Sequence, residues 1–196
     1  NTNIETTIDI SFLMAGVLTE GAISKNQSFY LAYRESLMSL WVFGEDIEED
    51  FNVPELPSFN DYQGKYLWRL GDERALIFSV NGVKDEISAI YGENNEDVLL
   101  NPGLEGNASV KSEFHNQNIT WRSPNLDVIV GHGREKSKDK VGNGEYLDYI
   151  EDVATLKAHT HKIINRHELS IGAMIEHSLY DYEFNLRLEK CSDFTP

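Results

Sequence analysis

The sequence predicts an α+β fold, in which two long helices cover an antiparallel sheet built largely from hairpins. Apolar residues follow helical spacing in residues 24–41 and 145–166, and they alternate with polar residues in several other segments. Strand-like segments also follow one another directly, which favours antiparallel pairing over strict strand-helix-strand alternation. With 196 residues, 40% of them hydrophobic, the chain has enough apolar material for one core, so we expect a single domain over residues 1–196.

The first predicted helix covers residues 24–41. Ser24 and Gln27 fit the capping box that begins many helices, and Gly44 is suited to end one. Three- and four-residue steps separate the apolar residues between them, which places these on one helical face: Phe29, Tyr33, Leu37, Leu40 and Trp41.

The second predicted helix covers residues 145–166. Its acidic residues are concentrated in the first turns, where the helix dipole favours negative charge. Its apolar residues form an imperfect helical face: Leu147, Ile150, Val153, Leu156 and Ile163.

The first half of the chain holds three strand-like segments. Residues 8–12 alternate between apolar and polar side chains, as a half-buried strand does. Residues 65–70 and 74–80 are rich in strand-forming residues and are joined by Gly71-Asp72-Glu73, so they predict a hairpin. Residues 83–91 fit a helix or a strand.

The second half of the chain predicts shorter strands separated by turns. Alternation over 110–114 and again over 119–121 indicates a second hairpin, and the apolar run 126–130 suits a strand buried on both faces. Glycine and mixed charge indicate a mobile loop over 131–144. Long alternation from 169 to 188 favours a closing hairpin that turns near His177, with a helix over 168–179 as the alternative.

The charge of the chain restricts its partners. Thirty-three acidic residues against 17 basic ones give a formal net charge of −16, which repels nucleic-acid phosphates. Direct nucleic-acid binding is therefore not expected. An acidic surface serves solubility, or it recruits a basic protein partner. The sequence hypothesis is accordingly a noncatalytic inhibitor, immunity-type factor or adaptor, one version of which is a nucleic-acid mimic that occupies a cationic groove.

The partner-binding surface is predicted in the acidic segment 45–61 and at the residue that follows it. This segment contains seven acids, no bases and two prolines, and aromatic residues lie among the charges. Acidic and aromatic side chains together are suited to holding a basic protein surface. The predicted contact residues are Glu45, Asp46, Glu48, Glu49, Asp50, Phe51, Glu55, Phe59, Asp61 and Tyr62.

Catalysis has no clear motif, and no cofactor or metal is predicted. The alternative hypothesis is a metal-dependent hydrolase or nuclease. In a helix, His159 and His161 would face opposite sides, whereas in a strand they would share a side. The segment from Pro124 to Lys138 resembles the active site of restriction-type nucleases, although its glutamate and lysine are three residues apart rather than two. The residues assigned to this alternative are His132, His159, His161, Asp127 and Glu135.

Compartment is predicted from apolar runs and cysteine use. The longest apolar run, residues 10–18, falls well short of the roughly 20 residues that a membrane helix needs, so no membrane partner is expected. Cys191 is the only cysteine, which favours a reducing, cytoplasmic setting. Acceptor triplets that begin at Asn26, Asn107 and Asn118 leave secretion as the alternative.

Overall fold

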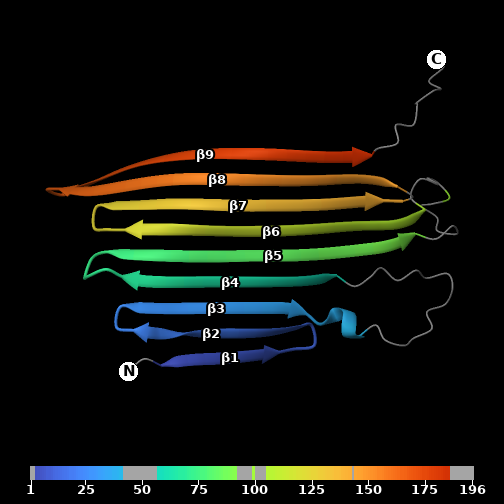
Figure 1. The fold of residues 1–196 in the computed structure, drawn as a ribbon, viewed down its shortest axis with the longest axis horizontal. Helices are drawn as coiled ribbons and strands as arrows, with labels where there is room; N and C mark the ends of the chain where they lie inside the picture. Colours follow the sequence, from blue (N-terminus) through green and yellow to red (C-terminus); the bar gives the residue numbers. More distant parts are fainter. Residues whose placement is uncertain (1–2, 42–56, 92–98, 100–104, 143, 186–196) are drawn as a thin grey trace, which may run out of the picture.

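Nine antiparallel strands follow one another in chain order across a single sheet in the computed structural model of the chain (Figure 1). The structure describes residues 3–41, 57–91, 99, 105–142 and 144–185. Each strand pairs with its neighbours in sequence: β1 (Ile4–Ile10), β2 (Met14–Ser24), β3 (Gln27–Ser36), β4 (Ser58–Arg69), β5 (Ala75–Tyr91), β6 (Gly106–Arg122), β7 (Leu126–Val141), β8 (Glu145–Ile164) and β9 (His167–Asn185). A short 3-10 turn, η1 (Met38–Trp41), follows β3.

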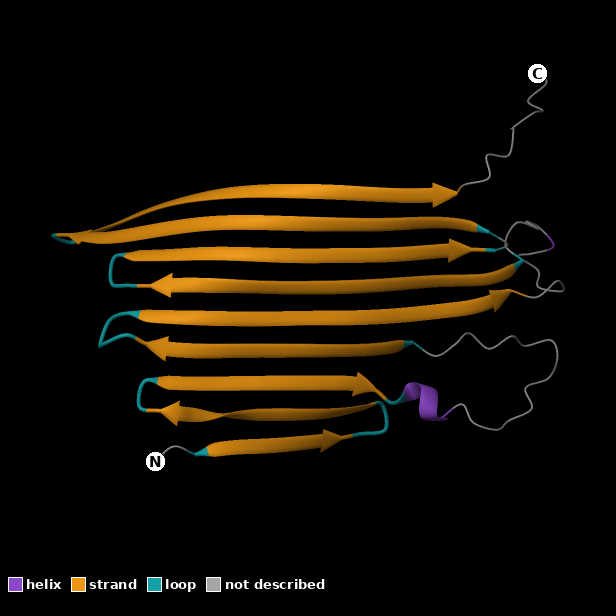
Figure 2. Ribbon diagram, viewed as in Figure 1, coloured by secondary structure: helices purple, strands orange, loops and turns teal. Residues whose placement is uncertain are grey.

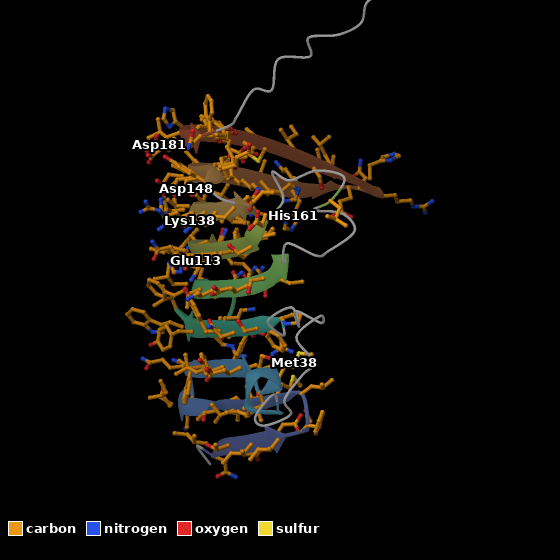
Figure 3. All side chains as sticks on the ribbon, turned by 90° about the vertical axis from the view of Figure 1, so that its right-hand side faces the viewer. Met38, Glu113, Lys138, Asp148, His161 and Asp181 are labelled. Atoms are coloured by element: carbon orange, nitrogen blue, oxygen red, sulfur yellow. The ribbon has the colours of Figure 1, made fainter. Side chains whose placement is uncertain are left out.

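The described sheet is one layer thick, as the edge-on view shows (Figure 3). Strand pairing places Phe78 on one side, called face 1 below, and Ile77 on the other side, called face 2. Only Ile77, which is 7% exposed, is a buried hydrophobic residue in the part of the chain that the structure describes. No described element covers either face, so most apolar side chains of the sheet are exposed.

The predicted α+β fold with two long helices is wrong, because both helical segments are strands (Figure 2). Residues 24–41 form the end of β2, a tight turn, β3 and η1, and residues 145–164 form β8. Phe29 and Tyr33 lie four residues apart, and residues at that spacing share a face in a strand as well as in a helix. Of the described residues, none forms a helix long and apolar enough to cross a membrane.

The hairpin predicted from residues 65–80 is confirmed by β4 and β5, which pair from Arg69–Ala75 outward. Other predicted turns are wrong, because continuous strands run through them. β6 passes through residues 115–118, β7 passes through the predicted loop 131–144 as far as Val141, and β9 passes through His177. β5 to β9 contain 17, 17, 16, 20 and 19 residues, whereas a strand in a globular protein usually has five or six.

The two ends of the sheet differ in their connections (Figure 1). At the end drawn on the left, all the connections between strands are short turns, for example residues 70–74 between β4 and β5. At the other end, the connections include residues 37–57 and 92–105. We call these the turn end and the loop end.

Candidate functional site

The predicted partner-binding residues are only partly described. Phe59, Asp61 and Tyr62 lie on β4, but the first two are on face 2 and Tyr62 is on face 1. Asp61 is also paired with Arg34 at 2.9 Å, so its charge is compensated. The acidic surface therefore stays a prediction, since seven of its ten residues lie outside the described residues: Glu45, Asp46, Glu48, Glu49, Asp50, Phe51 and Glu55.

The alternative metal site is not assembled in the described sheet. His159 and His161 share face 2, with ring centroids 6.3 Å apart, and Asp127 is opposite His159. Asp127, however, lies 3.7 Å from Arg122 in an ion pair. Among the residues that the structure describes, no group of three or more His, Cys, Asp or Glu is placed to hold a metal ion.

The remaining residues of that alternative lie elsewhere. His132 is on face 1, opposite to the side that carries His159. Glu135 lies eight residues beyond Asp127 on β7, which corresponds to about 26 Å along a strand. Lys138 is on the other face from Glu135. The nuclease-like residues therefore do not converge on one point.

Face 1 carries an unbroken apolar row that crosses all nine strands. The register pairs each member with the next, and no polar side chain interrupts the row except for the tyrosine hydroxyl. Several members are open to solvent, from 39% exposed at Phe78 to 68% at Ile175. In strand order the row is Ile4, Gly21, Phe29, Tyr66, Phe78, Ile119, Val130, Leu156 and Ile175.

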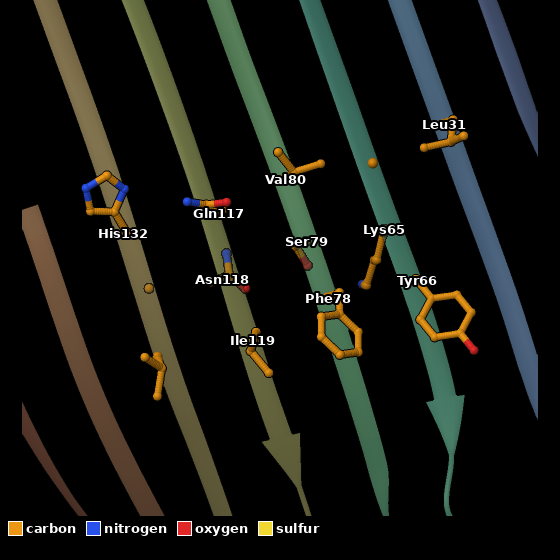
Figure 4. Close-up of a pocket in the computed structure, with 13 residues that line it drawn as sticks. Leu31, Lys65, Tyr66, Phe78, Ser79, Val80, Gln117, Asn118, Ile119 and His132 are labelled. Atoms are coloured by element: carbon orange, nitrogen blue, oxygen red, sulfur yellow. The ribbon is translucent and has the colours of Figure 1, made fainter.

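Further apolar and amphipathic side chains border this row. On its turn-end side the next row holds Trp68, Leu76, Trp121 and Val128. On its loop-end side lies a hollow of about 480 Å³ that is lined by Leu31, Phe78 and Val80, among others (Figure 4). Gly64 lies in that hollow, and a methyl group there would approach Val80 Cγ1 to 3.0 Å and Leu31 Cδ2 to 3.1 Å. Glycine thus lets the two aliphatic side chains approach over the backbone.

Beyond the apolar row, towards the loop end, face 1 becomes charged. Lys138 Nζ lies 2.8 Å from Asp148, and Lys111 Nζ lies 3.0 Å from Glu86. Glu113 belongs to the same region and projects to the same side of the sheet as Lys138 and Asp148 (Figure 3). These cross-strand pairs replace the predicted mobile loop, whose basic residues lie in a line along one face of β7: Arg134, Lys136, Lys138 and Lys140.

A second hollow, of about 520 Å³, lies on face 1 in this charged region. The Tyr62 hydroxyl and His115 Nδ1 form a short hydrogen bond at its edge, and their rings are tilted with centroids 6.0 Å apart. Tyr62 lies across Gly82, where an added methyl group would meet the tyrosine ring at 2.5 Å. The glycine therefore positions Tyr62 against His115.

Face 2 is polar in its centre. The amide side chains of Gln63, Asn81 and Asn116 occupy successive strands of one row. Asn118 Nδ2 donates to Asn116 Oδ1 at 3.4 Å. Face 2 therefore has the hydrogen-bonding groups of a surface in contact with water, as face 1 does at Gln117 and His132, in the row next to the apolar row.

No family model, curated protein or solved structure matches the chain. The inference about function therefore rests on the two faces of the sheet.

The apolar row is the feature that sequence reasoning missed. Leu156 and Ile175 were each recognisable as apolar, but only the pairing register places them side by side. A search for alternation over 16 to 20 residues, without turns assigned to internal glycine or asparagine, was the signal available in the sequence.

Proposed function

We propose that the protein is a noncatalytic sheet that lies in a lipid bilayer, with the apolar row of face 1 against the hydrocarbon. The observation that carries this proposal is the continuity of the row from Ile4 on β1 to Ile175 on β9. Nine strands at a spacing of about 4.8 Å give a row about 38 Å wide, all of which must be removed from water.

The ends of the row favour lipid over a packed protein layer. A protein that covered the sheet would leave polar side chains at its rim. Here both ends of the row are apolar and open to solvent, since Ile4 on β1 is 59% exposed and Ile175 on β9 is 68% exposed. A layer that continues beyond both edges, as hydrocarbon does, matches this pattern.

The order of side chains along the strands also supports lipid contact. Trp68 and Trp121 lie on the turn-end side of the row, and Tyr62 lies on its loop-end side, where the charged region begins. Tryptophan and tyrosine are enriched where a bilayer meets water. The charged pairs farther along the same face then lie outside the hydrocarbon.

The sheet edges impose a further condition. No described strand pairs with the outer edge of β1 or of β9. Unpaired backbone groups cost several kcal/mol each in hydrocarbon. The proposal therefore requires further strands to pair with both edges when the sheet lies in lipid.

Lysine substitutions on adjacent residues of β8 test the proposal. Leu156 lies in the apolar row, whereas Thr155 is next to it in sequence and lies on face 2. A charge in hydrocarbon costs about 2.5 to 3.5 kcal/mol, so Leu156→Lys should weaken partition into phosphatidylcholine vesicles by more than tenfold. Thr155→Lys should leave this partition unchanged.

Vesicle flotation measures the partition, and circular dichroism reports whether each variant keeps its strand content. Equal flotation of both variants with retained strand content would contradict lipid contact on face 1. If the parent chain binds no vesicles and stays monodisperse without detergent, a protein layer covers the row instead.

A further inference from the structure

The second hollow on face 1 is richer in positive than in negative charge. Its lining includes three cations, Lys84, Arg134 and Lys136, and one carboxylate, Glu113. His115 also lines it. In a chain whose net charge is −16, such a local excess of cations needs a physical reason.

The cations of the hollow are held loosely by their carboxylate partners. Lys84 lies 3.9 Å from Glu113, and Arg134 lies 3.8 Å from Asp152. Lys136 forms no ion pair with any described residue, although Glu113 lies opposite it in the register. These cations can therefore bind another anion without first breaking a close contact.

Outside the hollow, two lysines of the same charged region are held more closely. Lys111 lies 3.0 Å from Glu86, and Lys138 lies 2.8 Å from Asp148. The hydrogen bond and charge of each partner carboxylate raise the pKa of the lysine it contacts. The cations of the hollow therefore differ from Lys111 and Lys138 in how closely a carboxylate holds them.

We propose that this hollow binds the phosphate of an anionic membrane lipid whose acyl chains lie on the apolar row. A guanidinium and two ammonium groups match phosphate oxygens in charge and in hydrogen-bond donors. When the Tyr62 hydroxyl donates to His115 Nδ1, the imidazole proton resides on Nε2, which supplies one more donor.

The spacing along β7 fits a lipid. Val130 belongs to the apolar row, and Arg134 follows it by four residues, or about 13 Å along a strand. An acyl chain spans half of the hydrocarbon thickness, or about 15 Å, so a chain that starts at the hollow reaches the row. Phosphate in the hollow therefore places the acyl chains of the same molecule over the row.

This inference rests on the proposed lipid contact, and vesicles of two compositions test the phosphate site separately from that contact. The full chain should bind phosphatidylcholine vesicles that contain phosphatidic acid several times more tightly than vesicles of phosphatidylcholine alone. The net charge of the protein predicts the opposite order. Failure to bind either vesicle overturns the proposed function, whereas equal binding to both overturns only the phosphate site.

A matched pair of lysine variants locates the site. Lys136→Gln removes a cation of the hollow without depriving a carboxylate of an ion pair, and it should lower binding to the phosphatidic acid vesicles about fivefold. Lys140→Gln removes the same charge from the same face of β7 outside the hollow and should leave the preference intact. Equal losses would show a general effect of charge and overturn the site.

Inorganic phosphate separates a lipid site from a site for the free ion. At constant ionic strength, it should compete only weakly, because it lacks the acyl chains that contact the row. Complete loss of the preference at low millimolar phosphate would show that the hollow takes the free ion, and would overturn the lipid assignment.

Discussion

Glu151 on β8 shows how single side chains tune the polar face. The Tyr149 hydroxyl donates to Glu151 Oε2 at 2.6 Å. Hydrogen bonds from Tyr149, and also from Tyr180 and Ser178, hold the pKa of the Glu151 carboxyl below its ordinary value of 4.5, and the same contact raises the pKa of Tyr149. Because the folded-state pKa of Glu151 is lowered, its stabilising effect is complete above about pH 4.5 and is lost as the pH falls through the folded-state value.

The Tyr149→Phe variant tests this contact. Without the donating hydroxyl, the pKa of Glu151 should rise towards 4.5, as measured by carbon NMR titration of the carboxyl group. Tyr146→Phe is the control, because the Tyr146 hydroxyl donates to Glu183 at 3.1 Å instead. A Glu151 pKa that is the same in the Tyr149→Phe variant and in the parent chain would show that the hydrogen bond does not set it.

At the scale of elements, the sequence predicted strands in several segments, but it assigned two other segments to helices and ended several strands too early. Along β8, three-residue steps alternate between the faces, with Leu147 and Val153 on face 2 and Ile150 on face 1. In a helix, residues three apart lie close together around the axis, so the same residues form an imperfect helical face in the sequence. Pairing with neighbouring strands favours the strand over the helix, because each strand gains a ladder of hydrogen bonds from its neighbours.

The false turns have a related cause. Glycine at positions 131 and 133 predicts a loop, but Gly131 and Gly133 both lie within β7, and a methyl group on either would meet its nearest neighbour at an ordinary 3.6 Å. Asn116 and Asn118 were likewise treated as turn residues and instead provide the polar centre of face 2. Turn-forming residues mark turns reliably only where strands are short.

Gly82 joins three strands through Tyr62 and His115, and Gly82→Ala tests that junction. An added methyl group would overlap the Tyr62 ring, so the ring must leave its position and the hydrogen bond to His115 should be lost. We expect a destabilisation of about 1 to 3 kcal/mol, measured by denaturant unfolding.

Gly131→Ala on β7 is the matched control, because its added methyl group fits beside Asn118 Cβ at 3.6 Å. It should change the free energy of unfolding by less than about 1 kcal/mol. Similar losses of unfolding free energy in the two variants would show that these strands need glycine itself, and not the room that it leaves for Tyr62.

For the whole molecule, the relation between the faces is what the sequence alone did not show. Composition indicated a core, because 40% of the residues are hydrophobic, but the described sheet is a single layer in which Ile77 alone of the described hydrophobic residues is buried. An apolar run long enough for a membrane helix is not needed when alternate residues of neighbouring strands supply one continuous apolar row.

The most direct test of the central claim is a nitroxide scan along β9 in phosphatidylcholine vesicles. Single cysteines at residues 171–176, in a Cys191→Ser background, carry the label. Ile171, Ala173 and Ile175 on face 1 should be accessible to oxygen, which concentrates in lipid, whereas Gly172, Met174 and Glu176 on face 2 should be accessible to a water-soluble nickel complex. A two-residue period with this phase is the result we predict, and equal nickel accessibility at all positions, or the reversed phase, would contradict the assignment of face 1 to lipid.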